Sequence, residues 1–290
     1  MKKLSVVTGA TGGMGYACAK IAGEKTAVLI GDVNQEKIDS AVEDLKALGV
    51  DACGMVCDIT DKEQVKAFAA KAASLGQIVA LYNVAGLSST QVKTVGPIMN
   101  VNAFGTLNMI KEFSKVMEGG CIMNVASSTA YWLPADRLPT KIFDLALTDE
   151  EAFREGMSSL AANTGIEYAI SKTFVKYITA KMAYQLGREK GIRIVSASPG
   201  VIDTAMTQNK ESDRGKSSAM SFCALGRLGR PEELAYSFVA LADERNSYVT
   251  GIDLLVDGGC GAEGYNGTNV RGQESGVSIE DVADSQTGQK

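Results

Sequence analysis

Tyr168 and Lys172 are the residues whose types and spacing most directly suggest chemistry. They lie four positions apart in a segment whose periodicity predicts a helix over residues 167–187. That spacing places both side chains on one helical face, where an ammonium can favour the phenolate form of a nearby phenol. A tyrosine tuned in this way exchanges protons near neutral pH. Alone, the pair fits a solvated lysine beside a half-buried tyrosine equally well, so other features must decide.

The chain contains no histidine. This excludes imidazole acid–base catalysis, Ser-His-Asp hydrolysis and histidine-ligated metals. Six cysteines are scattered, mostly within apolar stretches, which indicates buried, reduced thiols. Cys53 and Cys57 are four residues apart, but without a second pair they make a poor metal site, so no metal is expected.

Composition favours a small-molecule substrate. The chain has 290 residues, a hydrophobic share of 45% and a net charge of −5, which gives ample core and no electrostatic footprint for nucleic acid. No apolar stretch approaches the length that spans a membrane. The apolar run at residues 4–8 is too short for a signal core and leads into glycines. We therefore expect a cytoplasmic protein that binds neither nucleic acid nor membrane.

Short apolar segments alternate with longer segments of helical period, which is typical of repeated βα units around a parallel sheet. Strands are predicted at residues 4–8, 27–30, 54–57, 78–83, 121–125, 193–197 and 254–256. Helices are predicted at residues 14–22, 35–48, 62–75, 101–117, 167–187 and 232–242. The pattern predicts an α/β fold: a single doubly wound, Rossmann-type domain over residues 1–260 with a seven-stranded parallel sheet.

Two segments break this alternation. Residues 129–163 form a long insertion between the fifth strand and the following helix, and Thr148-Asp149-Glu150-Glu151 within it predicts a capped helix start. Residues 261–290 are rich in Gly, Ser, Asn, Gln and acids. We interpret them as a polar tail that is flexible or loosely docked.

The first strand runs into a glycine-rich turn, Gly9-Ala10-Thr11-Gly12-Gly13-Met14-Gly15, and then into a helix. Such a turn lets the backbone approach a pyrophosphate, which the helix N-terminus attracts. Asp32 ends the second strand about 20 residues past the glycines, where an acid binds ribose hydroxyls. Its charge would repel a 2′-phosphate, and neither Gly12 nor Val33 supplies a cation, so NAD is preferred over NADP. A solvated strand-end acid is the alternative for Asp32, and turn chemistry is the alternative for Asp58.

Together these residues make the chain resemble the classical short-chain dehydrogenase/reductases over about residues 3–259. The motifs that carry the resemblance are Thr8-Gly9-x-x-x-Gly13-x-Gly15, Asn83-Val84-Ala85-Gly86, Asn102-x-x-Gly105, Asn124-Val125-Ala126-Ser127-Ser128, Tyr168-x-x-x-Lys172, Ser198-Pro199-Gly200 with Thr204, and Val256-Asp257-Gly258-Gly259. Two departures stand out. Val84 replaces a second asparagine, and 39 residues separate Ser128 from Tyr168, where the classical connection is much shorter. Similar insertions occur in some bacterial hydroxysteroid dehydrogenases of the family.

The resemblance implies a catalytic set. Tyr168 would exchange a proton with the substrate oxygen, Lys172 would hold the nicotinamide ribose, Ser128 would hydrogen-bond the reacting oxygen, and Asn102 would keep a helix bend and a water. Ser128 is preferred over Ser127 because the family places its catalytic serine second in such a pair. The residues expected at the cofactor are Gly9, Thr11, Gly12, Gly13, Met14, Gly15, Asp32, Val33, Asp58, Ile59, Asn83, Ala85, Gly86, Pro199, Gly200, Ile202 and Thr204, with Tyr168 and Lys172.

The substrate pocket is expected to include Ser128, Tyr131, Trp132, Tyr168 and Met206. Apolar and aromatic walls favour a lipophilic alcohol or its ketone, such as a steroid or bile acid. Trp132 packing a small core of the insertion is the alternative. Sugar, polyol and acyl-thioester substrates stay open, as does a regulator that binds NAD without catalysis. The resemblance also implies a homodimer or homotetramer.

Overall fold

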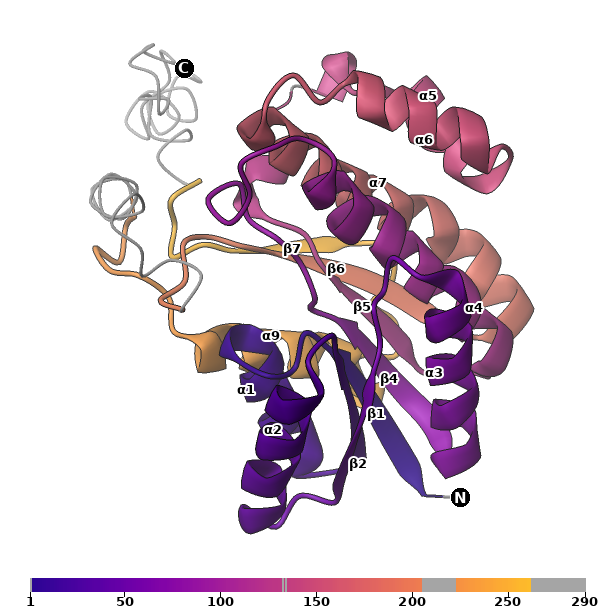
Figure 1. Cartoon of the computed structure of the whole chain (residues 1–290), viewed down its shortest axis with the longest axis vertical. Helices are drawn as coiled ribbons and strands as arrows, with labels where there is room; N and C mark the ends of the chain where they lie inside the picture. Colours follow the sequence, from indigo (N-terminus) through magenta and orange to yellow (C-terminus); the bar gives the residue numbers. More distant parts are fainter. Residues whose placement is uncertain (1, 132, 134, 205–222, 262–290) are drawn as a thin grey trace, which may run out of the picture.

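Seven parallel strands form one sheet in the computed structural model, which describes residues 2–131, 133, 135–204 and 223–261 (Figure 1). The spatial order is β3-β2-β1-β4-β5-β6-β7. The strands are β1 (Lys3–Thr8), β2 (Ala27–Asp32), β3 (Ala52–Val56), β4 (Gln77–Asn83), β5 (Cys121–Val125), β6 (Arg193–Pro199) and β7 (Asp253–Val256). The predicted doubly wound α/β fold with seven parallel strands is confirmed.

Helices cover both faces of this sheet. On one face lie α1 (Gly13–Gly23), α2 (Gln35–Ala47) and α9 (Pro231–Ala242); on the other lie α3 (Lys62–Leu75), α4 (Thr106–Val116) and α7 (Thr164–Lys190). Both faces are therefore buried, which explains why the strands read as continuous apolar runs. The connection after β1 leads toward the β3 edge of the sheet, and the connection after β4 leads toward the β7 edge. The carboxyl ends of β1 and β4 therefore flank a crevice suited to a ligand.

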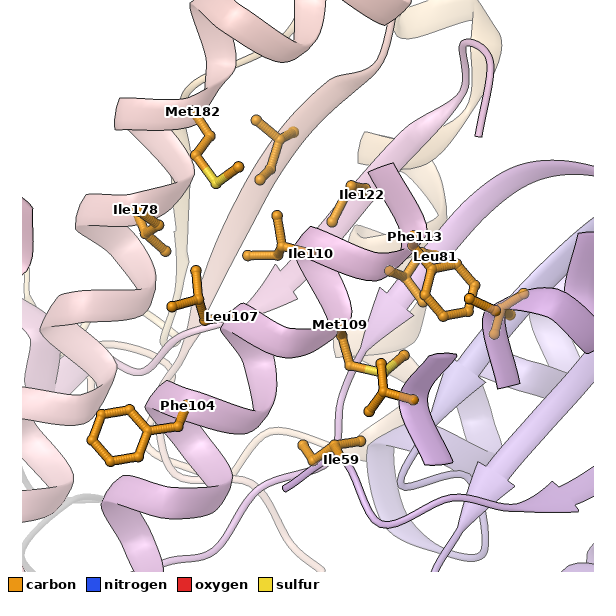
Figure 2. Packing of buried hydrophobic residues seen from close by; sticks show 14 of the residues in the cluster. Ile59, Leu81, Phe104, Leu107, Met109, Ile110, Phe113, Ile122, Ile178 and Met182 are labelled. Carbon is orange, nitrogen blue, oxygen red and sulfur yellow. The ribbon is translucent and has the colours of Figure 1, made fainter. Parts of the chain in front are cut away.

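Of the helices on the α3, α4 and α7 side of the sheet, α4 is the one that leads to the site. In Figure 2, Leu107 and Ile110 of α4 point toward Ile178 and Met182 of α7, whereas Phe113 points to the other side of the helix. All five side chains are buried. Because α4 is packed along both sides, it holds the helical turn that precedes it in a fixed position.

That preceding turn is a π-helix, η1 (Met99–Gly105), which continues directly into α4. The sequence predicts one helix over residues 101–117, and the structure divides it into two kinds of helix. A π-helical turn widens the backbone and often marks a functional site. Asn102 lies in the middle of this turn.

The segment between β5 and α7 contains the predicted insertion, residues 129–163, and Asn163 is the N-cap of α7. It holds η2 (Ser128–Tyr131), η3 (Ala135–Arg137), α5 (Thr140–Asp144), η4 (Leu145–Leu147) and α6 (Glu150–Ser159). Asp149 caps α6 by accepting a hydrogen bond from the Ala152 N–H (3.1 Å). In Figure 1, α5 and α6 lie outside α7, away from the sheet.

An aromatic cluster attaches the insertion to the domain. Phe153 of α6 is fully buried and lies 4.8 Å from Phe174 of α7 and 5.4 Å from Phe104 of η1, between ring centroids. Phe143 of α5 lies 5.5 Å from Phe174. The guanidinium of Arg154 sits 4.4 Å from the centre of the Phe104 ring. The insertion thus packs on the π-helical turn and on the helix that carries Tyr168.

All six cysteines lie in the described residues, and four of them are buried. Burial raises the pKa of Cys121 to about 11 and that of Cys57 to about 12, so these thiols stay protonated. Within the described part of the chain, no helix is long and apolar enough to cross a membrane. The predicted tail falls mostly in residues 262–290, outside the described residues.

Candidate active site

Tyr168 and Lys172 lie one turn apart on α7, which Asn163 starts by accepting a hydrogen bond from the Ile166 N–H (2.9 Å). The Lys172 side chain is buried, and its Nζ donates to the carbonyl oxygen of Val125 at the end of β5 (2.8 Å). The same Nζ lies 6.0 Å from the centre of the Tyr168 ring. The helix and the strand end together fix the ammonium beside the phenol, as the spacing predicts.

The two pKa values shift for the same reason. Burial raises the pKa of Tyr168, and a hydrogen bond with Ser127 partly offsets that rise. Burial also lowers the pKa of Lys172 to about 8. The expected lowering of the phenol pKa by the ammonium is therefore outweighed by desolvation in this structure. Tyr168 is a protonated phenol at neutral pH, ready to donate.

Ser127, and not Ser128, lies at the phenol. The Ser127 side chain is buried and hydrogen-bonds Tyr168, and its Oγ also accepts from the Thr129 N–H (3.3 Å). Ser128 is half-buried and begins the 3₁₀ turn η2. The strand ends at Val125, so the alternation of side chains that would carry Ser128 inward stops before it. The geometry replaces Ser128 with Ser127 in the candidate catalytic set.

Asn102 connects the π-helical turn to the loop after β4. Its Oδ1 accepts from the Leu87 N–H (2.8 Å) and its Nδ2 donates to the Leu87 carbonyl oxygen (2.9 Å). A longer bond runs from Nδ2 to the Ser171 Oγ (3.4 Å). A Cβ added to Gly86 would lie 3.1 Å from Asn102 Oδ1 and 3.4 Å from Lys172 Nζ. Gly86 therefore lies directly beside both polar groups, and Asn102 occupies a helix irregularity as the resemblance implies.

The glycine turn has the close approaches that its sequence predicts. Gly9 has a φ of +64°, and a Cβ there would come within 2.7 Å of Ala85. A Cβ on Gly15 would lie 2.1 Å from the Gly9 carbonyl oxygen, so the helix starts tightly against the turn. No described side chain caps α1, so none accepts from the backbone N–H groups of its first turn, which includes Met14 and holds no acid. These backbone N–H groups fit a dinucleotide pyrophosphate.

Asp32 lies at the end of β2 beside this turn. Its Oδ2 accepts from the Thr11 hydroxyl (2.8 Å), and its Oδ1 accepts from the Val33 N–H (2.8 Å). Thr11, which bonds Asp32, also lines a hollow of about 490 Å³ together with Gly12 and with residues of α2 that include Glu36 and Asp44. The carboxylate is thus held at the cofactor side of the loop in a region with more acids than cations.

Three other predicted cofactor residues bond or pack within the protein. Asp58 Oδ1 accepts from both the N–H and the hydroxyl of Thr60 (2.8 Å each), which is the turn chemistry considered for it. Ile59 is buried against Gly105. The buried Asn83 side chain donates from Nδ2 to Asn124 Oδ1 (2.8 Å). Their role at the cofactor stays a prediction.

The end of β6 returns to the glycine turn. A Cβ on Gly200, which follows Pro199, would lie 2.8 Å from Asp257 Cα, and Ile202 pairs with Gly229. A Cβ on Gly13 would lie 3.4 Å from the Thr204 side chain. The structure therefore brings Thr204 to the glycine turn from the far half of the sheet.

Tyr131 faces the edge strand. Its hydroxyl donates to Asp253 Oδ2 on β7 (2.7 Å), and the Lys176 ammonium sits 3.3 Å from its ring centre. The phenol is thus anchored between α7 and β7, and its hydroxyl is not directed at Tyr168. Trp132 and Met206, the other predicted wall residues, lie outside the described residues.

The chain is similar to known proteins along most of its length. A family model described as short chain dehydrogenase matches residues 3–134, and one described as Enoyl-(Acyl carrier protein) reductase matches residues 156–261. The 3alpha-hydroxysteroid dehydrogenase of Mediterraneibacter gnavus is 30% identical over 88% of this chain and 96% of its own length. The 3-oxoacyl-[acyl-carrier-protein] reductase FabG of Thermotoga maritima is 28% identical over 89% of this chain and 97% of its own length.

A crystal structure of a short-chain type dehydrogenase/reductase from Mycobacterium marinum superposes with a TM-score of 0.72 at 25% identity, covering 89% of this chain and 95% of that one. The order of the strands, the glycine turn and the Tyr168 and Lys172 pair are therefore accompanied by similarity along nearly the whole domain. The chain belongs to the short-chain dehydrogenase/reductase family of NAD(P)-binding oxidoreductases.

Proposed function

We propose that this enzyme uses NAD to oxidise a secondary alcohol reversibly to a ketone, and that the alcohol is a bulky lipophilic one such as a hydroxysteroid or bile acid. The observation that carries the proposal is the Tyr168 phenol, which bonds Ser127 and lies one turn before a buried lysine. A protein that only bound the dinucleotide would need the glycine turn and Asp32 but not this phenol.

The side chains divide the proton chemistry among them. In reduction, the Tyr168 phenol gives its proton to the ketone oxygen; in oxidation, the phenol must first lose its proton, and the phenolate then takes the proton of the alcohol hydroxyl. Ser127 donates a hydrogen bond to that oxygen and orients it. Lys172 and Asn102 both lie beside Gly86 and place their polar groups near the phenol. A dinucleotide bound at the glycine turn would supply the nicotinamide as acceptor for the hydride of the carbinol carbon.

The preference for NAD rests on Asp32. Its carboxylate is held by Thr11 at the cofactor side of the turn, where it can accept the ribose 2′-hydroxyl and would repel a 2′-phosphate. Glu36 and Asp44 add negative charge to the adjoining hollow, and Lys37 is the one cation among its described lining residues. This balance supports NAD over NADP.

The steroid part of the proposal is supported by the similarity to the 3alpha-hydroxysteroid dehydrogenase of M. gnavus over nearly the full length of both chains. The comparable similarity to FabG of T. maritima favours a second candidate, a reductase of acyl thioesters. These two candidate functions can be separated with a substrate panel of hydroxysteroids, sugars, polyols and 3-oxoacyl thioesters. Turnover of each substrate is measured by nicotinamide absorbance, with NAD and with NADP. No turnover of any hydroxysteroid would remove the steroid part.

Tyr168→Phe tests whether the phenol is catalytic. We expect turnover to fall by several orders of magnitude, because the proton acceptor is gone, while NAD affinity measured by fluorescence stays within about threefold. Parallel loss of binding and turnover would make Tyr168 a structural residue.

Two further expectations complete the proposal. A homodimer or homotetramer is proposed from the family resemblance, and light scattering of the purified chain would measure it. A cytoplasmic location is proposed as well, and fractionation of the source cells would test it.

A further inference from the structure

We propose that Glu167 is a positioning residue that fixes the start of η1 and thereby sets Asn102 relative to Tyr168 and Lys172. The inference rests on the proposed function, in which Asn102 belongs to the proton-transfer region. It assigns a role to the one carboxylate that the sequence places next to the reactive phenol.

Glu167 is fully buried at the start of α7. Its Oε1 accepts two backbone hydrogen bonds, from the N–H groups of Gly96 and Met99 (2.8 Å each). Its Oε2 has no hydrogen-bond partner among the described residues. A buried carboxylate with one unpaired oxygen is costly. Its presence therefore calls for a role beyond filling space.

The Gly96 N–H lies just before the π-helical turn and the Met99 N–H begins it, in the region of a helix start where backbone donors have no partner within the helix. Met99 is the first residue of η1, and Ile98 before it has no side chain able to accept a hydrogen bond. The missing cap comes instead from α7, the helix that carries Tyr168 and Lys172. Glu167 is thus a direct polar link between the two helices of the site.

Asn102 lies three residues after Met99 and clasps Leu87 through both amide atoms. The loop between Leu87 and Met99 is therefore held at one end by Asn102 and at the other by Glu167. If the Glu167 end is released, the π-helical turn loses its fixed start, and the Asn102 side chain loses its alignment with Leu87. Hydrogen exchange of the Leu87 N–H therefore measures the effect of Glu167, although Glu167 does not contact Leu87.

Matched variants test this link. Glu167→Met keeps the approximate length of the side chain but cannot accept the two hydrogen bonds, whereas Glu167→Gln keeps an accepting oxygen. Residue-resolved hydrogen exchange should show at least about tenfold faster exchange of the Leu87, Gly96 and Met99 amides in the Met variant, with the central strands unchanged. The Gln variant should stay within about threefold of wild type. Glu167→Asp, whose carboxylate is one methylene shorter, repeats the test if the Met variant does not fold.

Enzyme kinetics of the same variants provide a second test. We expect Glu167→Met to lower kcat at least about tenfold while the Kd for NAD changes less than about twofold, and Glu167→Gln to restore most of kcat. In an Asn102→Ala background the Met substitution should add little further loss, because both changes remove the same positioning.

Fully protected Leu87 exchange in Glu167→Met, or losses that add in the double variant, would overturn the inference. If the wild-type chain turns over no substrate in the panel, the proposed function fails, and the exchange measurement still decides the role of Glu167.

Discussion

Lys172 places an ammonium where solvation is poor, and this has a measurable consequence for stability. Its pKa in the folded chain is about 8, below the ordinary 10.5, because burial disfavours the charged form. Below pH 8 both states of the chain carry the charge, and the folded state bears the desolvation cost. Between about pH 8 and 10.5 the unfolded chain binds the proton that the folded chain has released, so this site makes stability rise with pH.

Lys172→Met removes that titration. At pH 7 the variant should be more stable than wild type, and the difference should shrink by about 3 kcal/mol as the pH is raised to 10.5. Urea unfolding of both proteins at a series of pH values measures it. A stability difference that is constant with pH would mean that the lysine is solvated. Lys176→Met, on the same helix but half-buried with its ammonium over the Tyr131 ring, serves as the control and should show a smaller change with pH.

The serine pair gives the second test at this scale. Ser127→Ala should lower kcat by about 10²–10³, since the hydrogen bond to the reacting oxygen is lost. Ser128→Ala, one residue away, should leave kcat within about threefold of wild type because the hydrogen bond to Tyr168 comes from its neighbour. Steady-state kinetics on the best substrate of the panel compares the two. The reverse order of effects would reinstate Ser128.

At the scale of elements, the insertion behaves as part of the core and not as an appended loop. Phe153 contacts Phe104 of η1 and Phe174 of α7, so α6 is packed against both helices of the site. Phe153→Ala should lower the free energy of unfolding by about 3–5 kcal/mol, the cost of an aromatic cavity in a core. Leu147 in the same insertion is 39% exposed, and its replacement by Ala should cost less than about 1 kcal/mol. Equal, small effects in urea unfolding would show that the insertion packs loosely.

The elements also show how far sequence reasoning reaches. The boundaries of β5 and α3 agree with the prediction because apolar runs and the Asp61 cap mark them, and Asp61 does accept from the Gln64 N–H (3.2 Å). The π-helical turn was not predictable, since the bonding that defines it leaves no period in the sequence. Its cap, Glu167, is 68 residues from Met99. Contacts at that separation come from packing and not from local pattern.

At the scale of the whole molecule, the site is assembled from both halves of the sheet. The glycine turn follows β1 and Asp32 ends β2, while Thr204 follows β6 and still reaches Gly13. The sequence predicts this meeting because the carboxyl ends of parallel strands share one edge. It does not predict which strand-end side chains face the cleft, and this is why Asn83 and Tyr131 have partners elsewhere.

Because a dinucleotide would touch both halves, its binding should stabilise the entire domain. At about 100 times its Kd, NAD should add about 2.7 kcal/mol, which is roughly 5–10 °C in Tm for a domain of this size. NADP at the same concentration should give a smaller shift, because its 2′-phosphate meets the Asp32 carboxylate. Differential scanning fluorimetry with each dinucleotide measures both shifts.

The Asp32→Ser and Val33→Arg double substitution removes the acid and adds a cation, so the NADP shift should then exceed the NAD shift. Asp58→Asn is the matched control, since the Asp58 carboxylate already accepts from Thr60 and should leave the order of the shifts unchanged. Equal shifts for NAD and NADP in the wild-type chain would contradict the assignment of Asp32 as the residue that selects the cofactor. An order unchanged by the double substitution would move that selection to another part of the hollow, where Lys37 is the cation nearest in sequence.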